Sequence, residues 1–131
     1  MQKSVTKVKR SPKTSSSETL SKAIIEGMID KKGHEIAVLD LRLIKGAIAD
    51  FFVICTGNSD THVEAISESI EEMVYKATSQ EPWHREGKVT REWILLDYVD
   101  VVASVFKSGT RKYYSLEQLW GDALITWVNP E

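Results

Sequence analysis

Two apolar runs separated by a short acidic turn constrain the fold of this chain more than any other feature. Residues 94–98 and 101–107 have the composition of β-strands, and Val99 and Asp100 lie between them. This junction is too short for a helical crossover, so the two strands are predicted to be antiparallel neighbours or one bent ribbon. A β-sheet is therefore expected at the centre of the fold.

Apolar periodicity predicts helices and further strands around this pair. The predicted helices span residues 18–32, 60–77 and 115–127. The predicted strands span residues 35–41 and 51–56, with a short edge strand at 112–114 and a loop at 79–92. This order predicts a single α/β domain in two or three layers, with a mixed β-sheet flanked by helices.

Each predicted helix has an apolar stripe and a capping signal. The expected stripes are Leu20, Ile24 and Met28; Val63, Ile66, Ile70, Met73 and Ala77; and Leu116, Leu119, Trp120, Ala123, Leu124 and Trp127. The expected capping boxes are Ser15 with Glu18, Thr61 with Glu64, and Ser115 with Gln118. A solvated acidic face is expected from Glu64, Glu68, Glu71 and Glu72. Trp120 and Trp127 fit the core or a homodimer contact, and the core is favoured.

Charge divides the chain into two parts. Residues 1–17 contain five basic residues and no acid, and they lack periodicity, so a disordered tail is expected there. An electrostatic arm and a transit peptide are alternatives for this segment. Residues 18–131 contain the remaining 12 basic residues and all 19 acidic ones, which gives them a net charge of −7. A folded domain over residues 18–127 should therefore favour a basic partner over bare nucleic acid.

Cysteine content and hydropathy indicate a cytoplasmic protein. Cys55 is the single cysteine, so an internal disulfide and a Cys-rich zinc site are excluded. Its apolar surroundings predict a small core residue in a reducing compartment. No apolar run reaches the roughly 18 residues of a membrane span, so no membrane partner is expected.

Candidate catalytic groups are few. Gly57, Asn58 and Ser59 follow a strand and open a helix, where phosphates bind, but a capped turn is the simpler interpretation. Asp97 and Asp100 supply at most part of a metal site. Three histidines, at positions 34, 62 and 84, do not have metal-ligand spacing. We therefore expect no enzyme activity, no metal and no cofactor.

Trp93 offers a more specific signal, because it begins a predicted strand. If Leu96 points into the core, then Trp93, Leu95 and Asp97 share the opposite face of that strand. A tryptophan, a leucine and a carboxylate on one exposed face are typical of a protein-binding hot spot. The alternative is that a helix covers this face and Trp93 belongs to the core.

Four motifs in order resemble the ribosomal silencing factor family (Iojap/RsfS). They are residues 49–59 (Ala-Asp-Phe-Phe-Val-Ile-Cys-Thr-Gly-Asn-Ser), Glu86-Gly87, residues 93–102 (Trp-Ile-Leu-Leu-Asp-Tyr-Val-Asp-Val-Val) and residues 114–120 (Tyr-Ser-Leu-Glu-Gln-Leu-Trp). The resemblance covers about residues 18–124. It implies a nucleotidyltransferase-like fold without the transferase motifs, and a non-catalytic factor.

The resemblance also implies a partner and a mechanism. Members of this family bind the large ribosomal subunit through its fourteenth protein and block its association with the small subunit, which represses translation. Trp93 and Leu95 would bury apolar area, Asp97 and Asp100 would meet Lys or Arg, and Tyr98 would pack at the rim. The implied partner-binding residues are Trp93, Leu95, Asp97, Tyr98, Asp100 and Val101.

The chain departs from the family at two places, and other functions stay open. Family members usually have Gly at the position of Val99 and a Val-His pair at Ala103-Ser104. The turn at Val99 therefore needs no positive φ or tolerates a strained one. The alternatives are a small metal-dependent nucleotidyltransferase using Asp97 and Asp100, and a nonspecific RNA-binding adaptor using residues 1–17. Sequence-specific nucleic-acid binding is not expected.

Overall fold

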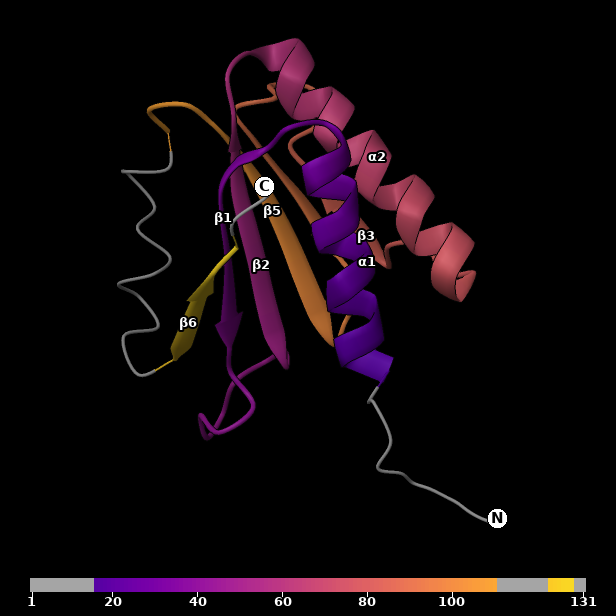
Figure 1. Cartoon of the computed structure of the whole chain (residues 1–131), viewed down its shortest axis with the longest axis vertical. Helices are drawn as coiled ribbons and strands as arrows, with labels where there is room; N and C mark the ends of the chain where they lie inside the picture. The colour runs from indigo at the N-terminus through magenta and orange to yellow at the C-terminus, as the bar shows by residue number, and fades with distance from the viewer. Residues whose placement is uncertain (1–15, 111–122, 129–131) are drawn as a thin grey trace.

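A computed structural model describes residues 16–110 and 123–128 of the protein. Two helices and six strands form one α/β unit (Figure 1). They are α1 (Ser16–Asp30), β1 (His34–Asp40), β2 (Phe51–Gly57), α2 (Asp60–Thr78), β3 (His84–Glu86), β4 (Trp93–Asp97), β5 (Val101–Lys107) and β6 (Leu124–Trp127). Because α1 begins at Ser16, the helix includes the last two residues of the segment expected to be a disordered tail.

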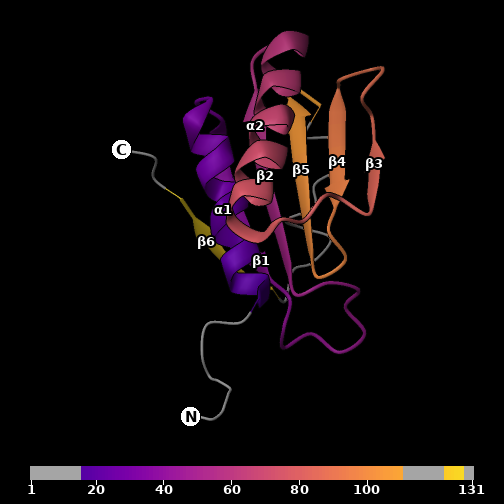
Figure 2. The ribbon, with the colours of Figure 1, turned by 90° about the vertical axis from the view of Figure 1, so that its right-hand side faces the viewer.

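The six strands form one mixed sheet in the order β3-β4-β5-β2-β1-β6. β2 and β5 pair in parallel, and the four other described pairs are antiparallel. Both described helices cover the same face of the sheet, as the side view in Figure 2 shows. The predicted α/β class with a mixed sheet is confirmed, and so is the antiparallel pairing of the strands on either side of Val99 and Asp100.

Apolar side chains pack on both faces of the sheet. On the helix-covered face, α1 contributes Leu20, Ile24 and Met28, as the sequence periodicity predicts. A second cluster on the opposite face includes Ile54, Val102 and Phe106, all buried. Cys55 is a buried core residue, as expected. Within residues 16–110 and 123–128, no helix is long and apolar enough to cross a membrane.

The helices α1 and α2 approach each other closely at Gly27. A Cβ atom at this position would lie 2.6 Å from the Cα of Ile70, so a glycine is required for this contact. The Ser69 hydroxyl donates a buried hydrogen bond to the Gly27 carbonyl oxygen at 2.9 Å. This contact fixes the crossing of the two helices over β2 and β5.

The cap and the buried face of α2 differ from the sequence prediction. Ser59, not Thr61, is the N-cap, and its hydroxyl accepts a hydrogen bond from the His62 N–H at 3.2 Å. Ser59 stands just before the first helical residue, where a side-chain oxygen reaches the free N–H groups. The buried stripe runs through Val63, Ile66, Ile70 and Val74. Met73 is half-buried and Ala77 is exposed, because the helix turns these positions away from the sheet.

The predicted C-terminal helix is wrong where the structure describes it. Residues 124–127 form β6, which pairs antiparallel with β1, with Leu124 opposite Asp40 and Trp127 opposite Ala37. Pairing with β1 satisfies backbone groups that would otherwise lie at a sheet edge. Trp127 is 59% exposed, so the favoured core position for it is also wrong. The predicted edge strand at 112–114, the start of the helix at Ser115, the position of Trp120 and the cap at Ser15 lie outside the described residues.

A short strand was not expected in the polar segment 79–92. β3 pairs antiparallel with β4, with Arg85 opposite Leu96. Its three residues are all exposed, so it has no apolar alternation by which it could be recognised. β3 nevertheless extends the sheet beyond β4 and brings Trp83 beside the end of that strand.

Candidate protein-binding surface

The side chains of β4 alternate between the two faces of the sheet. Ile94 and Leu96 are fully buried on the helix-covered face. Trp93, Leu95 and Asp97 are half-buried on the opposite face, as the alternation predicts. We call these three residues the β4 strip. In the register of the two strands they lie beside Phe106, Ser104 and Val102 of β5, respectively.

Trp93, the first residue of β4, forms one end of the β4 strip. Its ring stacks on the Phe106 ring with centroids 5.2 Å apart and an interplanar angle of 12°. Beside it is a hollow of about 400 Å³ lined by Glu86, Gly87, Thr90, Glu92, Trp93 and Leu95. Gly87 has a φ of 87°, and a Cβ atom there would overlap the Trp93 carbonyl group. Gly87 therefore lets the β3–β4 loop pass close to Trp93. The hollow combines an aromatic residue with two carboxylates, which suits a cationic side chain.

The turn between β4 and β5 forms the other end of the strip. The Asp97 carboxylate accepts a hydrogen bond from the Val99 N–H at 2.8 Å. The Tyr98 N–H donates to the Val101 carbonyl at 2.9 Å, which closes the turn. Val99 has a φ of 77° and is 56% exposed. The turn therefore needs a positive φ, and this chain tolerates a strained valine where the resemblance implies glycine.

Two of the expected contact residues lie in the core. Tyr98 is 5% exposed and Val101 is fully buried, both on the helix-covered face. The expected rim position of Tyr98 is wrong because the alternation of β4 continues through Ile94, Leu96 and Tyr98. Burial, and secondarily the negative charge of Glu71, raises the pKa of the Tyr98 hydroxyl. Asp100 is exposed in the turn, so four of the six expected residues border the surface.

Ala103 and Ser104 replace a Val-His pair that the resemblance implies, and both are buried in β5. Ser104 lies opposite Leu95 in the register of the two strands. The described residues offer no structural explanation for this pair of substitutions.

Sequence reasoning missed Trp83 and Ile48, which are exposed apolar residues near Asp97. The Trp83 N–H donates a hydrogen bond to the Asp97 carbonyl oxygen at 2.7 Å. Trp83 and Ile48 line a hollow with Asp97, Val99 and Val102. A single exposed apolar residue is common on protein surfaces, so the tryptophan in this polar segment is not by itself a signal in the sequence.

The strand-to-helix turn at residues 57–59 has a structural explanation. A Cβ atom at Gly57 would lie 2.9 Å from Val63 Cγ2, so this glycine permits close packing of β2 against α2. The His62 ring accepts from the Asn58 N–H at 2.8 Å, and its Nε2 lies 2.7 Å from the Lys31 carbonyl oxygen. The interpretation of this segment as a capped turn is confirmed.

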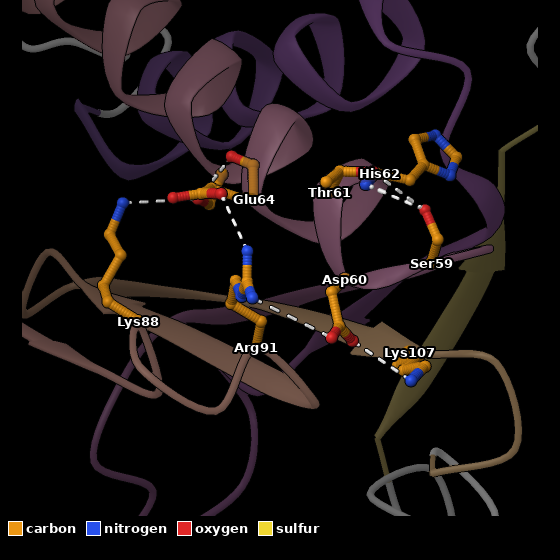
Figure 3. A network of polar contacts seen from close by, with 9 residues as sticks. Ser59, Asp60, Thr61, His62, Glu64, Lys88, Arg91 and Lys107 are labelled. Atoms are coloured by element: carbon orange, nitrogen blue, oxygen red, sulfur yellow. Dashed lines mark hydrogen bonds and ion pairs between the residues drawn. The ribbon is translucent and has the colours of Figure 1, made fainter.

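An ion-pair network lies at the same end of α2 (Figure 3). Asp60 is 3.0 Å from Lys107 Nζ and 3.9 Å from Arg91 Nη2, and Arg91 Nη1 is 3.4 Å from Glu64. These pairs join the first turn of α2 to the β3–β4 loop and to the end of β5. An acidic residue at the first helical position also interacts favourably with the helix dipole.

A second ion-pair cluster connects α2 to β3. Arg85 donates two hydrogen bonds to Glu71, at 3.0 and 2.9 Å, and Lys88 Nζ lies 3.4 Å from the same carboxylate. Burial alone would raise the pKa of Glu71, but the Arg85 hydrogen bond and the two positive charges outweigh it and lower the pKa. The expected solvated acidic face of α2 is confirmed for Glu68 and Glu72, which are exposed. It is wrong for Glu71, which is mostly covered and holds the β3–β4 segment in place.

Asp97 and Asp100 do not assemble into a metal centre with other described side chains. No group of three or more His, Cys, Asp or Glu side chains that could hold a metal occurs in residues 16–110 and 123–128. One oxygen of Asp97 is already bound to the Val99 N–H. The geometry at this turn fits charge recognition better than metal binding.

The fold and the β4 strip define a small mixed-sheet α/β domain with a candidate protein-binding surface at one edge. A family model described as ribosomal silencing factor during starvation matches residues 14–131. The chain therefore belongs to the ribosomal silencing factor family.

Curated relatives and a solved structure agree with this assignment. The chain is 39% identical over 108 residues to the ribosomal silencing factor RsfS of Halalkalibacterium halodurans, covering 82% of this chain and 91% of that protein. It is 43% identical over 94 residues to RsfS of Bacillus subtilis, covering 72% and 78%. A crystal structure of a protein from Chromobacterium violaceum matches with a TM-score of 0.72 at 33% identity, covering 78% of this chain and 83% of that one.

Proposed function

We propose that this protein represses translation by binding the large ribosomal subunit through its fourteenth protein and sterically blocking association with the small subunit. Membership of the ribosomal silencing factor family supports the coarser part of this proposal, a ribosome-associated regulator of translation that is not an enzyme. The proposed site of action is the cytoplasm, where translating ribosomes are found. The partner-binding surface and the steric mechanism are the parts that experiment must test.

The observation that carries the proposal is the composition of the β4 strip. An aromatic ring, a leucine and a carboxylate share one face of a single strand, with Asp100 exposed in the following turn. Interfaces are enriched in tryptophan, and a few such residues supply most of the binding energy. The net charge of −7 over residues 18–131 favours a basic partner such as a ribosomal protein.

Each residue of the strip has a proposed role. Trp93 and Leu95 would bury apolar area against the partner, and the adjacent hollow with Glu86 and Glu92 would accept a lysine or arginine. Asp97 and Asp100 would pair with further cations. Truncating one side of a desolvated charge pair costs about 2–5 kcal/mol, so these carboxylates should affect affinity strongly.

Cosedimentation with purified large subunits tests the proposal. We expect the wild type to pellet with large subunits and to reduce the yield of joined ribosomes when small subunits are added. Trp93→Ala should remain in solution, and Asp97→Asn should bind more weakly. The asparagine keeps an oxygen for the Val99 N–H, so this variant removes charge without removing the turn hydrogen bond.

Matched controls separate the surface from general effects. Trp127→Ala removes an exposed tryptophan from β6, at the far edge of the sheet. Glu68→Gln removes an exposed carboxylate from α2, which packs on the face of the sheet opposite the β4 strip. Both controls should pellet like the wild type. If the wild type fails to pellet at low salt, or if Trp93→Ala and Trp127→Ala bind equally well, the proposed function or its surface is wrong.

A further inference from the structure

Three exposed apolar side chains converge beside Asp97. Ile48 comes from the β1–β2 loop, Trp83 precedes β3, and Val99 lies in the β4–β5 turn. Figure 2 shows the β1–β2 loop beside the β4–β5 turn, at the lower end of the sheet. The three side chains line a hollow of about 310 Å³ together with Asp97 and Val102. We call it the Trp83 hollow.

Backbone hydrogen bonds hold the walls of the Trp83 hollow in place. The Trp83 N–H donates to the Asp97 carbonyl at 2.7 Å, and the Asp50 N–H donates to the Asp100 carbonyl at 2.7 Å. The first bond fixes the segment before β3, and the second ties the β1–β2 loop to the β4–β5 turn. The hollow is therefore a preformed feature, which lowers the entropic cost of binding.

The exposure of these side chains does not serve the stability of the domain. Ile48 and Trp83 are each 77% exposed, and Val99 is 56% exposed. Clustered exposed apolar residues mark interaction sites more often than isolated ones do. Val99 also has a φ of 77°, which is unfavourable for a β-branched residue. Strained residues of this kind cluster at functional sites.

The charge around the hollow indicates the kind of partner. Asp97 lines the hollow, and Asp100 is exposed in the same turn. Among the described residues, neither carboxylate forms an ion pair, and one oxygen of Asp97 is bound to a backbone N–H. Apolar walls beside two carboxylates without cationic partners suit a protein segment that pairs an apolar side chain with Lys or Arg. The same carboxylates repel an RNA backbone.

We propose that the Trp83 hollow receives an apolar side chain from a basic segment of the partner protein, while an adjoining Lys or Arg of that segment pairs with Asp97. This inference rests on the proposed function, because the hollow shares Asp97 with the β4 strip and would extend the same contact. Ile48, Trp83 and Val99 lie outside the β4 strip, and the inference assigns to them a role in determining specificity for the partner.

Affinity for the purified fourteenth protein of the large subunit, measured by titration calorimetry, tests this inference. Trp83→Ser and Ile48→Ser should each weaken binding by about 5- to 30-fold, the range of a substantial hot-spot residue. Val99→Gly should weaken binding similarly. Because this substitution relieves the backbone strain, the lower affinity cannot be ascribed to unfolding of the domain. Leu43→Ser and Val89→Ser are the controls, because both positions are apolar and 90% exposed but lie outside the hollow.

The outcomes separate this inference from the proposed function. If the wild type binds, Trp93→Ala does not, and the three hollow variants bind within about twofold of the wild type, the inference is overturned and the proposed function stands. If the wild type does not bind, both are overturned. If the hollow variants instead reduce self-association, measured by analytical ultracentrifugation, with unchanged affinity for the ribosomal protein, the occupant is a second copy of this chain and the inference is again overturned.

Discussion

The Asp97 carboxylate accepts a hydrogen bond from the Val99 N–H at 2.8 Å, in a turn where Val99 has a φ of 77°. Aspartate side chains often bond to a backbone N–H two residues further on and thereby stabilise a tight turn. Here the bond holds a valine in a conformation that favours glycine. The same carboxylate is thus a structural acceptor and the charge that the proposed partner would meet.

Replacing Val99 by glycine should raise the stability of the domain. The left-handed conformation costs a residue other than glycine about 1–2 kcal/mol, while the greater freedom of glycine in the unfolded chain offsets about 0.5–1 kcal/mol. We expect Val99→Gly to raise the free energy of unfolding by about 0.5–1 kcal/mol in urea titrations. Val89→Gly is the control, since Val89 is exposed without a positive φ, and it should give no gain. Equal stability of Val99→Gly and the wild type would show that the turn carries no strain.

Replacing Gly27 by alanine should lower stability although alanine favours helices. The added Cβ would lie 2.6 Å from Ile70 Cα and 3.0 Å from the Ser69 carbonyl oxygen, and the backbone cannot move away as a side chain can. Overpacking of this kind costs about 1–3 kcal/mol, more than the helix propensity returns. Thermal unfolding of Gly27→Ala should therefore show a lower Tm, while Glu26→Ala, an exposed neighbour on α1, should leave it nearly unchanged. A Gly27→Ala variant as stable as the wild type would contradict this helix crossing.

Replacing Tyr98 by phenylalanine should leave partner binding unchanged and preserve or raise stability. The Tyr98 hydroxyl is buried, and it has no hydrogen-bond partner among the described residues. Burying such a group without a partner costs about 1–3 kcal/mol, which phenylalanine avoids. Urea unfolding of Tyr98→Phe should show a gain of about 1 kcal/mol, with Tyr75→Phe as the exposed control. A loss of stability would show that the hydroxyl is hydrogen-bonded, and a loss of affinity would return Tyr98 to the interface.

The parts of the fold that depend on local periodicity could be predicted from the sequence. Leu20, Ile24 and Met28 mark one face of α1, and the alternation along residues 93–97 assigns Ile94 and Leu96 to the core. The strands β3 and β6 could not be found in this way. β3 consists of exposed polar residues that become a strand because β4 offers them an edge. Leu124 and Trp127 fit a helical spacing as well as a strand, and pairing with β1 decides between them.

The candidate surface was predictable only where it lies on one strand. The β4 strip follows from alternation, whereas its partner-binding role is a proposal. Tyr98 was misplaced because the alternation of β4 continues one residue beyond the strand into the turn. The Trp83 hollow combines residues from three segments, and Ile48 and Trp83 are more than thirty positions apart in the sequence. Sequence spacing does not predict such a convergence. Ion pairing of Glu71 with Arg85 across α2 and β3 escaped prediction for the same reason.

The Glu71 cluster should make the stability of the domain depend on pH in the acidic range. Arg85 and Lys88 hold the pKa of Glu71 below its ordinary value of 4.5, against the effect of burial. A depressed pKa means that the ionised carboxylate stabilises the folded state above the unfolded pKa, and that this stabilisation is lost as the pH falls through the folded pKa. The segment that carries Trp83 and β3 therefore loses one of its attachments to α2 in acid.

The variant Glu71→Gln isolates this contribution. At pH 7 it should be less stable than the wild type by about 1 kcal/mol in urea titrations, because the pair is only partly shielded from water. The difference should shrink as the pH falls below about 4.5, since the protonated carboxyl then resembles the amide. Glu68→Gln is the control, because Glu68 lies exposed on the same helix, and its difference from the wild type should be small at every pH. A Glu71→Gln deficit that stays constant from pH 7 to pH 3 would mean that packing of the side chain, and not its charge, holds β3 against α2.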